Sequence, residues 1–141
     1  MALYLPEDIY KQVTGNLIAA YPNEGAGFLI GKVRDEQRDV CMILALHNES
    51  ETNEARNRYK IKANAYVEAE STAEKHDLDL IGVFHSHPDH PAKPSEYDRE
   101  FALPWWSYLI VSVYKNKVDH ATSWVLSDNR DHFIEELLNI E

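Results

Sequence analysis

A single domain of the mixed α/β (α+β) class is what this sequence predicts, and three observations lead to it. Apolar residues recur at helical spacing in residues 6–20 and 63–76. Runs rich in β-branched residues lie between and after these stretches, and Ser107 to Tyr114 is the clearest of them. The 141 residues suffice for one buried core and are too few for two ordinary domains. We therefore expect one domain across residues 1–141.

The N-terminal third is expected to form a helix followed by two strands. Apolar residues of the first stretch recur four positions apart, at Ile9, Val13 and Leu17. Pro6 lies near the first turn, and acidic residues follow it where the helix dipole favours them. The segment Tyr21-Pro22-Asn23 is expected to end the helix. The two strands, joined by a charged turn at residues 35–39, are Gly27 to Val33 and Val40 to Leu46.

The middle of the chain is expected to contain a polar loop, a short strand, a second helix and a buried strand. His47 to Glu54 is polar and turn-like, and Arg58 to Ile61 is a candidate edge strand. Ala63 to His76 is rich in Ala and Glu, which favours a helix. The apolar run from Leu80 to Phe84 then predicts a buried strand.

The C-terminal part is expected to begin with a short helix over Ser95 to Phe101. Two β-prone segments follow, Ser107 to Tyr114 and about His120 to Leu126, with a turn at residues 115–117. The residues of Phe133 to Ile140 leave helix and strand open, because their apolar positions also fit helical spacing.

Charge and composition argue against several classes of partner and location. The 14 Lys and Arg stand against 24 Asp and Glu, a formal charge of −10, which disfavours nucleic acid or an anionic membrane as a partner. No apolar run approaches the roughly 20 residues that cross a bilayer. The first residues lack the basic start and apolar stretch of a signal peptide. Cys41 is the one cysteine and lies in an apolar run, so we expect a buried thiol in a cytoplasmic protein.

Two histidines follow the buried strand, in the segment His85-Ser86-His87-Pro88. A proline cannot continue the hydrogen-bond ladder, so the strand is expected to stop there. Residues i and i+2 of a strand point to the same face, about 6.6 Å apart. Two imidazoles so placed can bind one ion at roughly 2.0–2.1 Å per bond. The spacing predicts a two-histidine platform for a metal ion.

A third metal ligand is expected from the helix that comes next. An open catalytic zinc site takes three protein ligands and keeps one position for water. Asp98 is the candidate, because it lies in the first turn of the helix, across a loop from Asp89 to Lys93. The residues alone leave two other interpretations open. Ser95-x-x-Asp98 also fits a helix cap, and two histidines with one carboxylate also bind ferrous iron.

The other histidines and the paired tryptophans are expected to have structural or surface roles. His90 comes three residues after His87, but it lies between two prolines, so we expect an irregular loop and no ligation. Trp105 and Trp106 are expected to pack in the core, given the area that Trp buries, and a place for one of them along the substrate channel stays open. The histidines without metal-ligand spacing to the motif are expected at the surface: His47, His76, His120 and His132.

The segment HSHPDHPAKPSEYD, residues 85–98, resembles the His-x-His-Pro-x6-Ser-x2-Asp signature of the JAMM (MPN-plus) metalloprotease family. YPNEGAGFLIG, at Tyr21 to Gly31, is similar to the glutamate and Gly-rich strand of that family, although Gly25-Ala26-Gly27 stands where the family often has Ala-Cys-Gly. The chain is identified as a member of the short bacterial or archaeal stand-alone type. The resemblance implies the JAB/MPN (cytidine-deaminase-like) fold, a mixed curved β-sheet flanked by helices that usually closes with a strand.

The resemblance also implies roles for five residues. It implies that His85, His87 and Asp98 bind one zinc ion per chain, that Glu24 is the general acid and base, and that Ser95 stabilises the oxyanion. Considered alone, Glu24 is expected to be a solvated loop carboxylate. The implied function is a zinc-dependent peptidase or isopeptidase. Its substrate would be the bond after the C-terminal Gly-Gly of a ubiquitin-like or sulfur-carrier (β-grasp) protein.

Two other functions remain open at this point. Some relatives with this fold have lost metal ligands and act as non-catalytic scaffolds or interaction modules, whereas here every expected ligand is present. A ferrous-iron enzyme with two histidines and one carboxylate is the second alternative. Many such enzymes are all-β, and the helical stretches argue for a mixed fold. A TIM-barrel metallohydrolase, which typically needs about 250 residues, is excluded by length.

Overall fold

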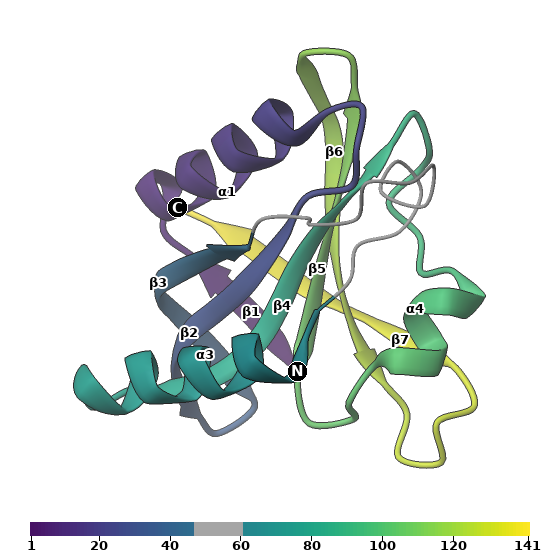
Figure 1. The fold of residues 1–141 in the computed structure, drawn as a ribbon. Coiled ribbons are helices and arrows are strands. Elements are labelled where there is room, and N and C mark those ends of the chain that lie inside the picture. Colours follow the sequence, from purple (N-terminus) through teal and green to yellow (C-terminus); the bar gives the residue numbers. More distant parts are fainter. Residues whose placement is uncertain (47–60) are drawn as a thin grey trace.

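The computed structural model describes residues 1–46 and 61–141, and this part of the chain forms three helices and seven strands (Figure 1). The loop expected at His47 to Glu54, His47 itself and nearly all of the strand expected at Arg58 to Ile61 lie outside the described residues. The elements in chain order are β1 (Ala2–Leu5), α1 (Glu7–Ala20), β2 (Ala26–Arg34), β3 (Gln37–Leu46), α3 (Ala63–Lys75), β4 (Asp79–Pro88), α4 (Glu96–Phe101), β5 (Ser107–Tyr114), β6 (Lys117–Leu126) and β7 (Phe133–Ile140).

The strands form one mixed sheet that curves until it closes, in the order β1-β3-β2-β4-β5-β6-β7. The pairs β4–β5, β1–β3 and β1–β7 are parallel, and the others are antiparallel. The sequence did not predict β1, whose four residues are too few to show a convincing alternation. This short strand nevertheless closes the sheet, because it pairs with β3 on one side and β7 on the other.

Two apolar clusters cover the two faces of the curved sheet. In α1, Ile9, Val13 and Leu17 recur at i, i+4 and i+8 and are buried against strand residues such as Leu29 and Phe84. On the other face α3 packs through Ala69 and its neighbours against the second cluster. Figure 1 shows α1 and α3 as separate rods flanking the strands, with α4 away from both. The expected mixed sheet flanked by helices is confirmed.

Two glycines at the start of β2 permit close packing there. A Cβ atom at Gly27 would lie 2.2 Å from Cζ of Phe84, so any side chain would displace that buried ring. A Cβ atom at Gly25 would lie 2.9 Å from Cδ2 of Leu17 on α1. A side chain at position 25 would therefore require the Leu17 side chain to shift.

Most expected element boundaries agree with the structure, and the remaining ones have local reasons. Phe133–Ile140 is a strand, β7, which pairs with β6 and β1. β6 begins at Lys117, three residues before the expected start at His120. β4 continues through Pro88, which pairs with Val113 of β5. The proline is therefore the last residue of the strand. Within the described residues, each helix is too short or too polar to cross a membrane.

Two expectations about buried side chains are wrong. Cys41 is exposed, because residues of β3 alternate between the two faces and its neighbour Val40 takes the inward position. Trp105 is 63% exposed, while Trp106 is buried and stacks on Tyr66 at a ring distance of 5.8 Å. Consecutive residues in the turn before β5 point in different directions, so only one of the two indoles reaches the core.

A buried charged group lies within the sheet at β3. The Arg38 guanidinium donates to the Ser107 hydroxyl at 3.2 Å and to the Trp105 carbonyl at 2.9 Å. Its Nη1 lies 3.8 Å from Oε1 of Glu136 on β7, and the two side chains are 5% and 2% exposed. Glu136 also accepts a hydrogen bond from Ser123 on β6 at 2.7 Å. Burial lowers the pKa of Arg38, and the charge of Glu136 opposes this shift.

Candidate metal centre

The last residues of β4 carry both motif histidines. His85 lies within the sheet, opposite Ala26 of β2 and Ile110 of β5. His87 lies opposite Ser112 of β5, and the pairing with β2 has ended by then because β2 begins at Ala26. The imidazole rings are 5.1 Å apart, centroid to centroid, which agrees with the expected same-face placement. One side of β4 is therefore open beside His87.

Glu24 reaches the site at this open side of β4. The next residue, Gly25, donates its N–H to the Ser86 hydroxyl at 2.8 Å and accepts from the Ser86 N–H at 3.0 Å. On the other side, the Tyr21 hydroxyl contacts the two Asp89 carboxylate oxygens at 2.8 and 3.0 Å. These contacts attach the segment before β2 to the segment around the histidines. Glu24 is only 4% exposed, so the expectation of a solvated carboxylate, based on that residue alone, is wrong.

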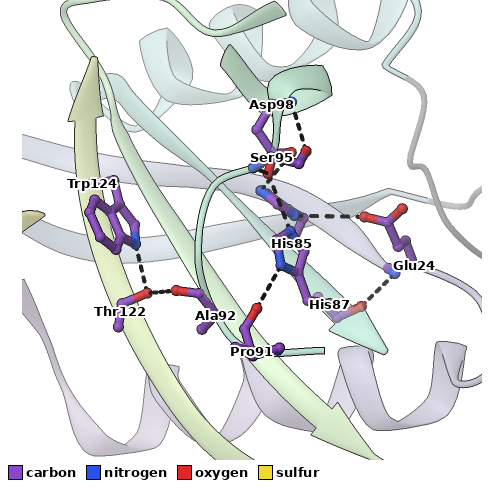
Figure 2. A network of polar contacts seen from close by, with 11 residues as sticks. Glu24, His85, His87, Pro91, Ala92, Ser95, Asp98, Thr122 and Trp124 are labelled. Carbon is purple, nitrogen blue, oxygen red and sulfur yellow. Dashed lines mark hydrogen bonds and ion pairs between the residues drawn. The ribbon is translucent and has the colours of Figure 1, made fainter. Parts of the chain in front are cut away.

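Asp98 takes part both in a helix cap and in contacts with the histidines. Ser95 is the N-cap of α4: its hydroxyl accepts from the Asp98 N–H at 3.1 Å, and Asp98 Oδ2 accepts from the Ser95 N–H at 2.8 Å. The same carboxylate lies 3.2 Å from Nε2 of His87 and 3.5 Å from Nε2 of His85. The capping interpretation of Ser95-x-x-Asp98 is confirmed, and the cap is what directs Asp98 toward the histidines (Figure 2).

The four side chains form one donor cluster that suits a transition metal ion. Glu24, His85 and His87 each offer a ligand atom, and these atoms lie within 4.8 Å of one another. Asp98 adds a second carboxylate beside both imidazoles. Imidazole nitrogen with carboxylate oxygen is a donor set of zinc hydrolases and also of ferrous-iron enzymes. The converging group of Glu24, His85 and His87 thus fits a metal ion, and Asp98 lies outside that group as a further carboxylate beside both imidazoles.

The electrostatics of the cluster favour a neutral imidazole at His85 and an ionised carboxylate at Asp98, whereas the raised pKa of His87 means that a proton competes with a cation at that ring. Burial lowers the pKa of His85 to about 4, against the opposing charge of Asp98, so this imidazole is neutral at neutral pH. Burial also lowers the pKa of His87, but the hydrogen bond and charge of Asp98 raise it more, and the net pKa is above the ordinary value. Burial by itself raises the pKa of Asp98, but the contacts with the histidines and with the Ser95 N–H lower it by more, so the net pKa lies well below its ordinary value. A neutral imidazole beside an ionised carboxylate is the ligand form that a cation requires.

A cavity of about 480 Å³ opens onto the cluster. Glu24, His87 and Asp98 line it, together with Lys93 and Tyr97. Three prolines, Pro88, Pro91 and Pro94, also line it. Because proline has no N–H, this part of the wall offers few backbone donors to a bound peptide.

The other histidines stand apart from the cluster. His90 is exposed and lines the cavity, and it does not belong to the group of converging ligand atoms found among the described residues. His76, His120 and His132 are exposed, as expected. Sequence reasoning missed Tyr21, Ser86 and Asp89, whose contacts join segments more than 60 residues apart. Spacing along the chain carries no signal for such pairs.

Comparison with known proteins places this arrangement in context. The family model described as prokaryotic homologs of the JAB domain matches residues 6–127. A curated relative from Thermus thermophilus, named a probable TtuB-protein conjugate cleaving protease, is 29% identical over 98 residues. These residues are 70% of this chain and 62% of the relative, so the match spans about three fifths of the relative's length.

Solved structures share the fold over nearly the whole chain. A protein of Desulfitobacterium hafniense has a TM-score of 0.85 at 26% identity, covering 100% of this chain and 93% of that one. A protein of Salinibacter ruber has a TM-score of 0.75 at 37% identity, covering 97% and 91%. A JAB1/MPN domain protein of Archaeoglobus fulgidus has a TM-score of 0.59 at 16% identity, covering 99% of both chains, which supports the fold alone. With the JAB/MPN fold and a family match over most of its length, this chain belongs to the prokaryotic JAB-domain family.

Proposed function

We propose that this protein is a zinc-dependent peptidase or isopeptidase that hydrolyses the bond after the C-terminal Gly-Gly of a ubiquitin-like or sulfur-carrier protein. The observation that carries the proposal is the convergence of Glu24 with two imidazoles, largely buried and with the Asp98 carboxylate beside them, next to a cavity that Glu24, His87 and Asp98 line. The Thermus thermophilus relative, a protease by its name, supports the reaction class. The proposal includes one JAMM-type domain over residues 1–141 and a cytoplasmic location.

The proposal assigns the zinc ligands to His85, His87 and Asp98. Asp98 contacts Nε2 of both imidazoles, whereas Glu24 Oε1 lies 3.9 Å from Nδ1 of His85. Asp98 thus approaches the imidazole nitrogens more closely, although the group of three converging ligand atoms joins Glu24 to the histidines. The proposal makes Asp98 the third ligand and leaves Glu24 to exchange protons. A bound zinc ion supplies a Lewis acid that polarises a carbonyl and lowers the pKa of a water molecule.

Glu24 and Ser95 have separate roles in the proposed hydrolysis. The Glu24 carboxylate accepts a proton from the attacking water and returns it to the leaving amine, so it is general base and then general acid. Its burial limits the competing access of bulk water to that proton. The Ser95 hydroxyl, at the N-terminus of α4 on the cavity wall, donates to the oxyanion that forms on the substrate.

The substrate assignment combines the resemblance with the shape of the cavity. A tail of two glycines lets a peptide backbone approach the cluster closely, because glycine has no side chain to collide with the wall. The proline-rich wall supports such an extended, narrow segment. The Thermus thermophilus relative is named for cleaving TtuB-protein conjugates, which suggests a sulfur-carrier protein as the partner here.

The experiment that tests this function uses intact mass spectrometry. The zinc-loaded protein is incubated with candidate Gly-Gly-tailed carrier proteins that bear C-terminal extensions, with and without a chelator. We expect release of the extension after the second glycine and no release with the chelator. No cleavage of any carrier by protein with stoichiometric zinc would refute the substrate class. Stoichiometric iron in place of zinc, measured by elemental analysis of the purified protein, would favour the ferrous-iron alternative instead.

Replacing Asp98 with asparagine is expected to weaken zinc binding by at least about a hundredfold, since even residues that only support a ligand contribute about ten- to a hundredfold. The amide oxygen can still accept the Ser95 N–H, so the cap of α4 is retained. Zinc affinity is measured by competition with a chromophoric chelator, and helix content by circular dichroism. The matched control is Glu100→Gln, an exposed carboxylate on the same helix. Equal zinc affinity in the two variants would remove Asp98 from the ligand set.

A further inference from the structure

The loop between the motif histidines and Asp98 is hydrogen-bonded to strand β6 through one loop residue, Ala92. The Ala92 N–H donates to Nε2 of His120 at 3.0 Å, and the Ala92 carbonyl accepts from the Thr122 hydroxyl at 2.5 Å. Ala92 is fully buried, so neither backbone group has water as an alternative partner. Both polar groups of one loop residue are thus bound by side chains of the same strand, 28 and 30 residues further along the chain.

Neighbouring side chains orient the Thr122 hydroxyl and set the tautomer of His120, so that both can bond to Ala92. The Thr122 hydroxyl accepts from Nε1–H of Trp124 at 2.7 Å, so its own proton is directed to the Ala92 carbonyl. His120 Nδ1 lies 2.6 Å from the Asp119 carboxylate, which assigns the proton to Nδ1 and leaves the lone pair of Nε2 for the Ala92 N–H. Figure 2 shows the part of this chain of contacts that runs from Trp124 through Thr122 to Ala92.

Ala92 is connected to the cluster through the residue before it. The Pro91 carbonyl accepts from Nδ1 of His87 at 3.0 Å and from the Lys93 N–H at 2.9 Å, so Ala92 is the central residue of a tight turn. A displacement of Ala92 therefore moves the Pro91 carbonyl. That carbonyl holds His87 with Nε2 toward Asp98, at 3.2 Å. Such a bond on the far nitrogen fixes the ring orientation of a metal-binding histidine.

We propose that His120 and Thr122 are positioning residues, which hold Ala92 and through the Pro91 carbonyl set the orientation of the His87 imidazole. The expected effect of His120 and Thr122 on zinc affinity rests on the function proposed above, whereas their effect on the orientation of the His87 ring does not. The inference also gives His120 a role that its exposed position alone does not suggest.

The first test removes the Thr122 hydroxyl. Thr122→Val keeps the shape of the side chain, and we expect its zinc affinity to fall by about ten- to a hundredfold in chelator competition. Thr122→Ser keeps the hydroxyl and is expected to remain within about threefold of the wild type. The matched control is Thr72→Val on α3, where the hydroxyl also donates to a backbone carbonyl, that of Glu68 at 2.8 Å. Equal zinc affinity in Thr122→Val and Thr72→Val would overturn the proposal.

The second test observes His87 in the metal-free protein. Long-range proton–nitrogen NMR at about pH 9 reports which ring nitrogen carries the proton. In the metal-free protein the Pro91 carbonyl at Nδ1 and the Asp98 carboxylate at Nε2 compete for the ring proton of His87. We expect His120→Ala to lower the share of the Nδ1-protonated ring relative to the wild type. The control is His76→Ala, which removes a histidine bonded to a carbonyl on α3. An unchanged His87 spectrum in His120→Ala would overturn the proposal. This readout needs neither zinc nor substrate, so a protein that cleaves no carrier still tests it.

Discussion

Replacing Glu24 with glutamine is expected to slow conjugate cleavage by about 10²–10⁴-fold, the usual contribution of a general acid or base. Glutamine has nearly the same shape, so it fits the buried position, but it cannot accept a proton at neutral pH. Zinc affinity is expected to stay within a few fold of the wild type, because the proposal leaves Glu24 outside the ligand set. Cleavage is measured in single-turnover reactions followed by intact mass.

The two measurements on Glu24→Gln separate three possible roles of this carboxylate. Slow cleavage with intact zinc binding supports proton transfer. Slow cleavage with lost zinc shows that Glu24 is a ligand, which the proximity of its carboxylate to the two histidines would then explain. Unchanged cleavage rules out the catalytic assignment. Glu96→Gln, an exposed change on α4, is the matched control and is expected to leave cleavage within about twofold of the wild type.

Replacing Arg38 with methionine is expected to lower the free energy of unfolding by about 3 kcal/mol, the lower end for breaking a buried ion pair. Methionine fills much of the volume, but Glu136 is left as a buried carboxylate without its cation, and the Trp105 carbonyl and Ser107 hydroxyl lose a donor. The measurement is urea-induced unfolding of the metal-free protein, followed by tryptophan fluorescence.

The control for Arg38→Met is a second arginine at an exposed pair. Arg34 Nε lies 2.6 Å from the Asp39 carboxylate, with the Arg34 side chain 67% exposed, so Arg34→Met is expected to cost at most about 1 kcal/mol. Equal losses of unfolding free energy in the two variants would show that burial of the Arg38 contacts does not increase their contribution to stability. Combining Arg38→Met with Glu136→Met is expected to recover part of the loss, because it removes the uncompensated charge.

The fold was predictable where a pattern is local. Apolar positions four residues apart predict the length and the buried face of α1, because a helix repeats its contacts within one segment. The local pattern of β7 fits a helix as well as a strand, since its pairing with β1 at the opposite end of the sequence decides the outcome. Cys41 was misjudged because an apolar run does not tell which face of a strand each residue takes.

The site was predictable to the extent that its residues lie in one segment. His85, His87 and Asp98 follow from a strand end, a loop and a helix start within 14 residues. Glu24 lies about 60 residues away along the chain, and only the family resemblance pointed to it. The contacts that place Glu24, between Gly25 and Ser86, depend on the pairing of β2 with β4. The same holds for His120, whose partner Ala92 is adjacent to it only because β6 and the loop meet on β5.

The short strand β1 has a consequence for the behaviour of the molecule in solution. Ala2–Leu5 pairs with Gln37–Asp39 at the start of β3 and with Leu137–Ile140 of β7 at once, and it thereby closes the ring of described strands. Exposed strand rims are where polypeptides associate into insoluble assemblies. This small segment thus covers the start of β3 and the end of β7, where the edge groups of those two strands would otherwise be open to pairing with another polypeptide.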